Sequence, residues 1–135
     1  MTHRIESTIT VAVVAPAALR DAYCVLLEAA AEVKVVACVT TVQALLQMAI
    51  EQPLDLVLLD AERRDEQATE QVRRIKAAWP TARCIVLVEH ARQEELVQKA
   101  GADVVLLKGI SPRRLLEIIK GGLISENSTQ SNKNV

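Results

Sequence analysis

The sequence has few aromatic residues and few glycines. Among its 135 residues there are one Trp, one Tyr and no Phe. Proteins that bind single-stranded nucleic acid stack its bases on several aromatic side chains, which Trp79 and Tyr23 alone do not provide. The glycines are Gly101, Gly109, Gly121 and Gly122. Their spacing builds neither of the glycine-rich loops that cradle phosphates, G-x-x-x-x-G-K-[ST] and G-x-G-x-x-G.

Excess charge and long apolar runs are also missing. The chain has 16 basic and 17 acidic residues, for a net charge of −1. Nucleic acids and anionic membranes attract basic surfaces, so this balance argues against both as partners. No apolar run reaches the length of about 18 residues that spans a bilayer. The N-terminal residues lack the apolar stretch of a secretory signal. We therefore expect a cytoplasmic protein with no nucleic-acid and no membrane partner.

The three cysteines are Cys24, Cys38 and Cys84. Three cysteines cannot all pair, and none lies near a second Cys or a His at the spacing of metal ligands. Each stands in an apolar stretch. We interpret them as buried, reduced thiols.

Half of the residues are apolar, and these are mostly Ala, Val, Leu and Ile. The length suits one domain. Five short apolar runs without polar alternation predict strands buried on both faces of a parallel sheet. These runs are Ile9–Val14, Val33–Cys38, Leu54–Leu59, Cys84–Val88 and Val104–Leu107.

Amphipathic segments of helical period separate these runs. They cover about 17–31, 42–50 with Thr40 or Thr41 as N-cap, a stretch ending at Trp79, about 93–100, and a last helix opening at Ser111-Pro112. In the first of them, Tyr23, Val25 and Leu27 widen the apolar face, which suggests a packing partner.

Strict alternation of strands and helices predicts a doubly wound α/β domain, because parallel connections need right-handed crossovers. For five such units we expect the flavodoxin-like strand order 2-1-3-4-5. The domain spans 8–122, after an N-terminal arm at 1–7 and before a polar tail at 123–135 that we expect to be disordered.

Binding sites in such folds form at the carboxyl ends of the strands. Asp60 directly follows the third apolar run, and Lys108 directly follows the fifth. They are the only pair of opposite charge predicted at the rim of the central strands. An Asp at this position can also be a simple cap or turn residue.

The ordered set of motifs resembles the receiver domain of bacterial two-component response regulators, of the type usually followed by a helix-turn-helix output domain. The resemblance covers about residues 8–122. Its strongest stretches are LDLVLLD at 54–60, VRRIK at 72–76 with Trp79-Pro80, RCIVL at 83–87, AGA at 100–102, and LLKG at 106–109 with Ser111-Pro112.

The resemblance implies that Asp60 stands at the phosphoacceptor position and Lys108 at the position of the lysine that neutralises the phosphoryl oxygens. It also exposes departures from the family. The acidic pair that holds Mg²⁺ falls on Ala15-Pro16, or on Val14-Ala15 if the register shifts by one. The hydroxyl residue after the fourth strand falls on Val88, and the aromatic switch residue falls on Val105. The usual turn after the phosphoacceptor is replaced by Arg63–Asp65.

These departures predict a pseudo-receiver, which keeps the fold for protein contacts and is not an enzyme. We expect no cofactor, with Mg²⁺ involved only if Asp60 is phosphorylated. The expected partners are signalling proteins, either a histidine kinase or a response regulator, bound in trans because the chain ends soon after the domain. A homodimer through strand five and helices four and five, with Val105, Leu115, Ile118 and Ile119, is also expected. The alternatives are a working single-domain response regulator phosphorylated on Asp60, and a small-ligand-binding α/β module.

Overall fold

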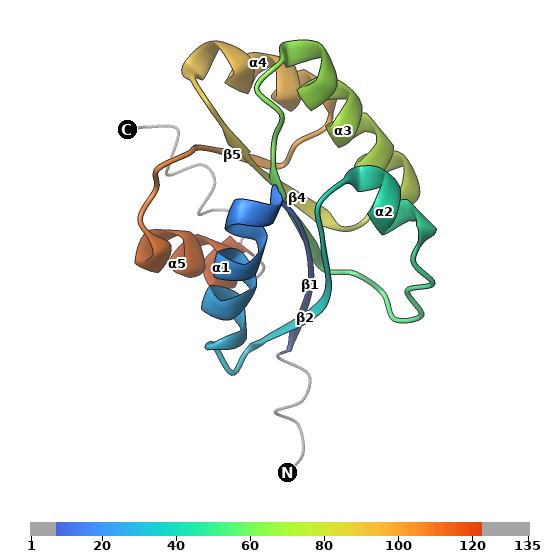
Figure 1. Ribbon diagram of the computed structural model, residues 1–135, viewed down its shortest axis with the longest axis vertical. Coiled ribbons are helices and arrows are strands. Elements are labelled where there is room, and N and C mark those ends of the chain that lie inside the picture. Colours follow the sequence, from blue (N-terminus) through green and yellow to red (C-terminus); the bar gives the residue numbers. More distant parts are fainter. Residues whose placement is uncertain (1–7, 123–135) are drawn as a thin grey trace.

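The computed structural model describes residues 8–122, which form a five-stranded parallel sheet between two layers of helices (Figure 1). The strands lie in the order β2-β1-β3-β4-β5, and each neighbouring pair is parallel. The elements are β1 (Ile9–Val14), α1 (Ala17–Glu28), β2 (Val33–Val39), α2 (Val42–Gln47), β3 (Leu56–Asp60), α3 (Asp65–Ala78), β4 (Arg83–Val88), α4 (Ala91–Ala100), β5 (Val104–Leu107) and α5 (Pro112–Gly122). The predicted doubly wound α/β fold and its strand order are confirmed.

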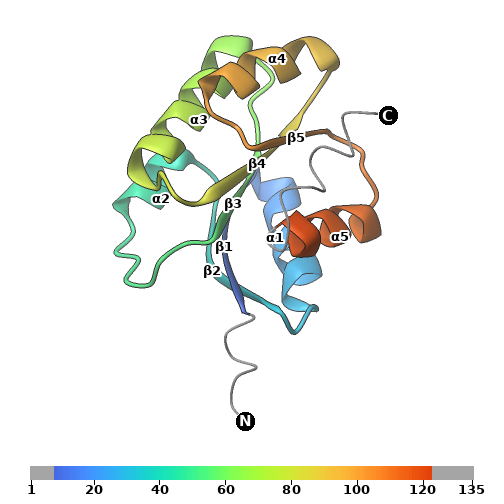
Figure 2. The same ribbon diagram turned by 180° about the vertical axis from the view of Figure 1, so that it is seen from behind.

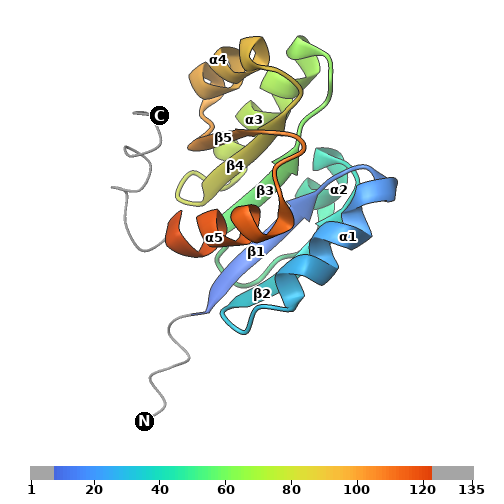
Figure 3. The same ribbon diagram turned by 90° about the vertical axis from the view of Figure 1, so that its left-hand side faces the viewer.

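The helices divide between the two faces of the sheet. Helices α1 and α5 cover one face, and α2, α3 and α4 cover the other, as the views from behind and from the side show (Figures 2 and 3). Each layer has its own apolar core, with Leu27 and Ile119 fully buried on the first face and Leu45, Val72 and Val97 on the second. The central strands are therefore buried from both sides, which explains why their sequences are apolar without alternation.

Three helices differ from their predicted bounds. Helix α1 ends at Glu28 rather than near residue 31. Helix α2 begins as expected, with the Thr41 hydroxyl oxygen accepting a hydrogen bond from the Ala44 amide at 3.0 Å. It ends at Gln47, because the backbone of Met48 is extended, and Ile50 packs against the core from the following loop. Helix α4 begins at Ala91, so that Gln93 lies in its first turn.

The interpretation of the cysteines is wrong for two of the three. A disulfide joins Cys24 in α1 to Cys38 in β2, while Cys84 is a free, buried thiol in β4 as expected. The crossover from β1 through α1 to β2 lays the helix over the strand and brings the two Cα atoms within 6.8 Å. Spacing along the sequence does not reveal such a pair, because the crossover creates the contact.

The arm at 1–7 and the polar tail at 123–135, which we expect to be disordered, lie outside the described residues. Between residues 8 and 122, no helix combines the length and apolarity needed to cross a membrane.

Candidate functional site

The predicted pair of opposite charges forms at the carboxyl edge of the sheet. Asp60 is the last residue of β3 and is only 5% exposed. Lys108 follows β5, and its Nζ lies 3.0 Å from Asp60 Oδ1. The same ammonium group donates a hydrogen bond of 2.7 Å to the Ala61 carbonyl. Lys108 therefore reaches across β4 to neutralise Asp60 and to hold the start of the next loop.

The second oxygen of Asp60 is also engaged. The Tyr23 hydroxyl, from α1, donates a 2.9 Å hydrogen bond to Asp60 Oδ2. Burial, together with the charge of Asp60 and this hydrogen bond, raises the pKa of Tyr23 well above its ordinary value. Tyr23 is thus a protonated donor at physiological pH, and both oxygens of the carboxylate have a partner within the chain.

Our interpretation of Tyr23, Val25 and Leu27 as a widened face for a partner is therefore wrong for two of them. Tyr23 belongs to the site and Leu27 is fully buried, whereas Val25 alone is widely exposed, at 68%. The signal in the sequence was a single tyrosine on a helix that begins at the rim of β1. Its polar tip needs a partner when its ring is buried, and Asp60 is that partner.

A small pocket of about 140 Å³ opens beside the pair. It is lined by Pro16, Thr40, Asp60, Ala61, Glu62, Arg63, Gln71 and Lys108. Glu89, which is exposed after β4, lies 3.6 Å from Lys108 Nζ through its Oε1. Lys108 is thus placed between one buried and one exposed carboxylate.

The rim of β1 offers no oxygen-bearing side chain. Val14 pairs with Leu59, which places Ala15 beside Asp60 and Pro16 at the mouth of the pocket. This register puts Ala15-Pro16, rather than Val14-Ala15, at the edge. Val88 ends β4 and is fully buried, and Val105 in β5 packs against the core of the second layer.

The residues present do not fit a magnesium ion. Mg²⁺ requires a near-octahedral shell of oxygen ligands. In the described part of the chain, no group of three or more His, Cys, Asp or Glu residues could hold a metal. At the pocket, Ala15 and Pro16 supply no carboxylate, and both oxygens of Asp60 are bonded to Lys108 and Tyr23.

A fully buried glutamine joins the two loops around the site. Gln93 donates from Nε2 to the carbonyls of Glu62 at 2.8 Å and Arg63 at 3.2 Å. Its Oε1 accepts a hydrogen bond of 3.1 Å from the Glu89 amide. The loop after β3 is therefore fixed to the loop after β4. Gln93 was not among the predicted site residues, although an amide four residues before the buried Val97, on the same helix face, is the signal for it in the sequence.

The expected dimer surface is only partly available. Leu115 and Ile119 are 1% and 0% exposed and belong to the core under α5, so neither can contact a second copy. Leu115 and Ile119 belong to the apolar face of α5, and this face packs against the sheet. Val105 and Ile118 are partly buried, and Leu107 at 51% is the most exposed large apolar side chain of β5.

Comparison with known proteins places the chain among receivers. The family model of the response regulator receiver domain matches residues 16–120. A CheY-like response regulator receiver domain protein from Methanospirillum hungatei JF-1 is 25% identical with a TM-score of 0.71, over 93% of this chain and 99% of that one. A response regulator from Thermotoga maritima is 26% identical with a TM-score of 0.71, over 87% and 99%.

A third similar structure is a LuxR family DNA-binding response regulator from Silicibacter pomeroyi. It is 25% identical with a TM-score of 0.67, over 82% of this chain and 88% of that one. No curated protein matches the chain.

Proposed function

Since the chain belongs to the response regulator receiver domain family, we propose that it is a pseudo-receiver within two-component signalling, which acts by binding other proteins. The observation that carries this proposal is the state of Asp60. Its two oxygens bind Lys108 and Tyr23, and no acidic neighbour from β1 accompanies it. A carboxylate in these contacts acts as a structural anion.

Phosphoryl transfer develops negative charge on the transferred group, and the site must stabilise that charge. A metal ion stabilises that charge by several kcal/mol, and removing one positioned donor costs roughly 10²–10³ in rate. Ala15, Pro16 and Val88 stand where the family has two acids and a hydroxyl. With all three groups missing, the ordinary Mg²⁺-dependent route has lost most of its stabilising contacts. We infer that Asp60 is phosphorylated very slowly, if it meets a phosphodonor at all.

The Asp60–Lys108 pair stabilises the fold whether or not Asp60 is phosphorylated. Asp60 is almost fully buried, and a buried carboxylate without a cation costs about 3–5 kcal/mol. Loss of Lys108 would therefore leave the buried Asp60 carboxylate without a cation, whereas Lys108 also has Glu89 within 3.6 Å. The pair does not by itself require phosphorylation chemistry.

The alternative of a working response regulator is supported by one observation, which is that Asp60 and Lys108 do meet at the expected edge. The alternative of a small-ligand module has less support. Pockets for small ligands usually measure about 300–1,000 Å³. The pocket beside Asp60 is about 140 Å³.

As partners we propose a histidine kinase or a response regulator, met in the cytoplasm, with no enzymatic activity and no cofactor of its own. We also propose that any homodimer through α4, β5 and α5 uses Leu107 and Leu96, which are 51% and 36% exposed. Sedimentation of the wild type and of Leu107→Ser distinguishes a dimer that uses this surface from a monomer.

A titration with Mg²⁺ tests the pseudo-receiver proposal. Amide resonances of Ala61 and Lys108, followed by NMR, should stay in place as MgCl₂ is added. A Pro16→Asp variant, which supplies a carboxylate at the mouth of the pocket, is the matched positive control. Its Ala61 and Lys108 amide resonances should shift as MgCl₂ is added. Saturable shifts in the wild type that vanish in Asp60→Asn would contradict the proposal.

A further inference from the structure

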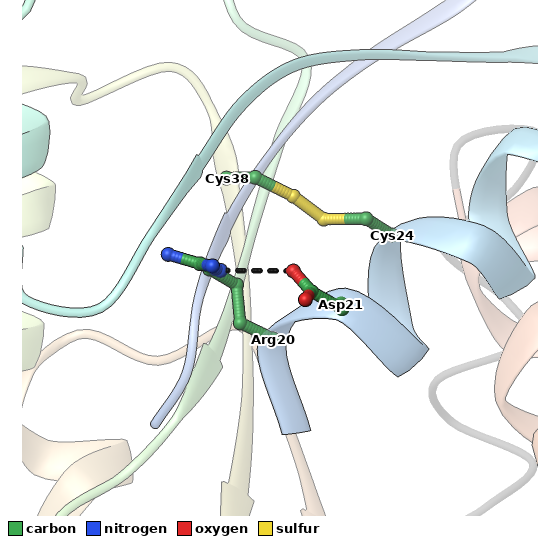
Figure 4. Close-up of a disulfide and its surroundings, with 4 residues drawn as sticks. All are labelled: Arg20, Asp21, Cys24 and Cys38. Atoms are coloured by element: carbon green, nitrogen blue, oxygen red, sulfur yellow. Dashed lines mark hydrogen bonds and ion pairs between the residues drawn. A yellow bond between two sulfur atoms is a disulfide. The ribbon is translucent and has the colours of Figure 1, made fainter. Parts of the chain in front are cut away.

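The disulfide lies next to the residues that build one wall of the Asp60 site. Cys24 directly follows Tyr23 in α1, and Tyr23 is the residue that holds Asp60 Oδ2. Cys38 in β2 stands two residues before Thr40, which lines the same pocket. Figure 4 shows the bond bridging the helix and the strand, with Arg20 and Asp21 from the preceding turn beside it. One covalent bond therefore ties together the two elements that place Tyr23 and Thr40.

Helix α1 has weak terminal support apart from this bond. Within the described residues, no side chain caps its N-terminus at Pro16, no acidic residue lies in its first turn, and no basic residue lies in its last. Such groups ordinarily stabilise helix ends. Cys24 and Leu27 are its only buried residues, and the partly buried Tyr23 and Leu26 pack against the same core.

From this arrangement we propose that Cys24 and Cys38 form a thiol–disulfide exchange site whose redox state decides whether Tyr23 holds Asp60. In the oxidised form α1 is fixed to β2 and the phenol is bound to the carboxylate. In the reduced form α1 is released from β2, and Tyr23 leaves Asp60. The surface that α1 and the pocket present to a partner then changes with the redox state.

The exchange chemistry requires a dithiol as reductant. One thiolate of the dithiol attacks a sulfur of the Cys24–Cys38 bond, which breaks as a mixed disulfide forms. The second thiol of the reductant then attacks the mixed disulfide. The reductant leaves as a disulfide, and both cysteines take up a proton to become thiols. Two electrons pass to the protein, and an oxidised dithiol reverses the process.

The environment of the bond suits such exchange. Cys38 is partly exposed on the edge strand β2, whereas Cys24 is buried, so Cys38 is the more accessible partner of the bond. Arg20 lies one helical turn before Cys24, and its guanidinium pairs with Asp21 at 3.1 Å. Disulfides in cytosolic proteins are usually transient and redox-sensing. The statement about cytosolic disulfides depends on the cytoplasmic location proposed above. The contacts between α1, β2 and Asp60 do not depend on it.

The third cysteine, Cys84, does not take part in the thiol–disulfide exchange. Cys84 is buried in β4, and burial, with the nearby charge of Asp103, raises its pKa to about 12. A thiol rather than a thiolate is unreactive in exchange. The Cys24–Cys38 pair is therefore the site that a dithiol reaches.

The single tyrosine makes the coupling measurable in the whole chain. At about pH 11 a tyrosine of ordinary pKa is about 90% ionised, and tyrosinate has its own near-ultraviolet absorbance. In the oxidised protein, Tyr23 should be below about 10% ionised at that pH, because burial and the contact with Asp60 both raise its pKa. After reduction with a dithiol, we expect the ionised fraction to exceed about 50% and to return to its first value on reoxidation.

Far-ultraviolet circular dichroism and the fluorescence of Trp79, which lies on the other face of the sheet, report whether the fold persists. Both should be unchanged by reduction. A Cys24→Ser/Cys38→Ser variant should ionise like the reduced protein in either condition, and Cys84→Ala should respond like the wild type. If the double variant does not fold, chemical reduction of the wild type still tests whether the ionisation of Tyr23 depends on the disulfide.

Equal ionisation of Tyr23 in both redox states would overturn the proposal. Loss of the fold on reduction would also overturn it, because the disulfide would then stabilise the whole fold and would not control the Tyr23–Asp60 contact alone. Neither outcome bears on whether Asp60 binds Mg²⁺ or accepts a phosphoryl group, so the two proposals fail separately.

Discussion

At the scale of single residues, Asp60 is a buried anion held between a cation and a phenol. Lys108 lies 3.0 Å from one of its oxygens, and the Tyr23 hydroxyl lies 2.9 Å from the other. The two partners contact the carboxylate in different ways, Lys108 by charge and Tyr23 by a hydrogen bond. The two contacts can be removed one at a time, which gives two tests.

Replacing Lys108 should strongly destabilise the protein. In Lys108→Met the buried Asp60 carboxylate loses its cation, and we expect a loss of about 3–5 kcal/mol in the free energy of unfolding. Urea denaturation followed by Trp79 fluorescence measures this quantity. The matched control is Lys99→Met on α4, an exposed lysine, which should change stability by less than about 0.5 kcal/mol.

The double variant Asp60→Asn/Lys108→Met removes both charges. It should recover most of the stability that Lys108→Met loses, because no unpaired charge stays buried. If Lys108→Met is as stable as Lys99→Met, the ion pair is not the structural feature described above.

The pKa of Tyr23 gives the second test and a pH dependence. Burial, then the charge of Asp60, then the hydrogen bond raise this pKa in the folded state. The unfolded chain ionises at about pH 10 while the folded chain still keeps its proton. The stabilisation is thus complete below about pH 10 and is lost as the pH rises through the folded pKa.

Titration of the single tyrosine by ultraviolet absorbance measures the shift. In Asp60→Asn the midpoint should move down, because the charge of Asp60 is removed, while burial, the largest cause of the shift, keeps it above the ordinary value. An unchanged midpoint in Asp60→Asn would show that Tyr23 does not contact Asp60 in solution.

At the scale of elements, the loops at the carboxyl edge are fixed by Gln93. Its amide bonds to the carbonyls of Glu62 and Arg63 and to the amide of Glu89, so α4 holds both the loop after β3 and the loop after β4. A receiver that signals by moving these loops needs them to separate. Here a buried side chain with all three hydrogen bonds inside the protein opposes that movement.

Gln93→Leu should release the two loops from each other. The carbonyls of Glu62 and Arg63 and the Glu89 amide lose their bonds to Gln93, at a cost of about 0.5–1.5 kcal/mol for each hydrogen bond. Hydrogen exchange of the Glu89 amide should become faster by the corresponding factor. Gln98→Leu, at an exposed position of the same helix, is the control and should leave this amide unchanged. Equal protection of Glu89 in both variants would contradict the role given to Gln93.

The elements themselves were predictable because their signals are local. Strands β1 and β5 have the predicted bounds, since an apolar run ends where the chain leaves the core. The beginning of α5 was predictable from Ser111-Pro112, and the Ser111 hydroxyl does accept a hydrogen bond from the Arg114 amide. Asp60 and Lys108 could be placed at one edge because parallel strands share their carboxyl ends.

The features missed in the sequence depend on contacts between distant segments. Tyr23 and Asp60 are 37 residues apart, and Gln93 and Glu62 are 31 apart. The pairing of Cys24 with Cys38 requires α1 to lie across β2. Each of these contacts is set by how a helix packs on the sheet, which the periodicity of the helix does not specify. The site was therefore predictable in its position and its central pair, but not in its supporting contacts.

At the scale of the whole molecule, the chain is a response regulator receiver domain. The response regulator receiver domain matches most of the chain, and the sheet has the strand order expected for that fold. The pseudo-receiver proposal rests on the edge of the sheet. There, Ala15, Pro16 and Val88 carry no carboxylate or hydroxyl group, and both oxygens of Asp60 are bound within the protein.

The most direct test of this account is incubation of the full chain with acetyl phosphate and Mg²⁺, followed by intact-protein mass spectrometry. A receiver with complete phosphotransfer chemistry and Asp60→Asn serve as positive and negative controls. The account predicts that the wild type gains no more phosphate than Asp60→Asn. A Mg²⁺-dependent phosphoryl adduct on the wild type that Asp60→Asn lacks would contradict it.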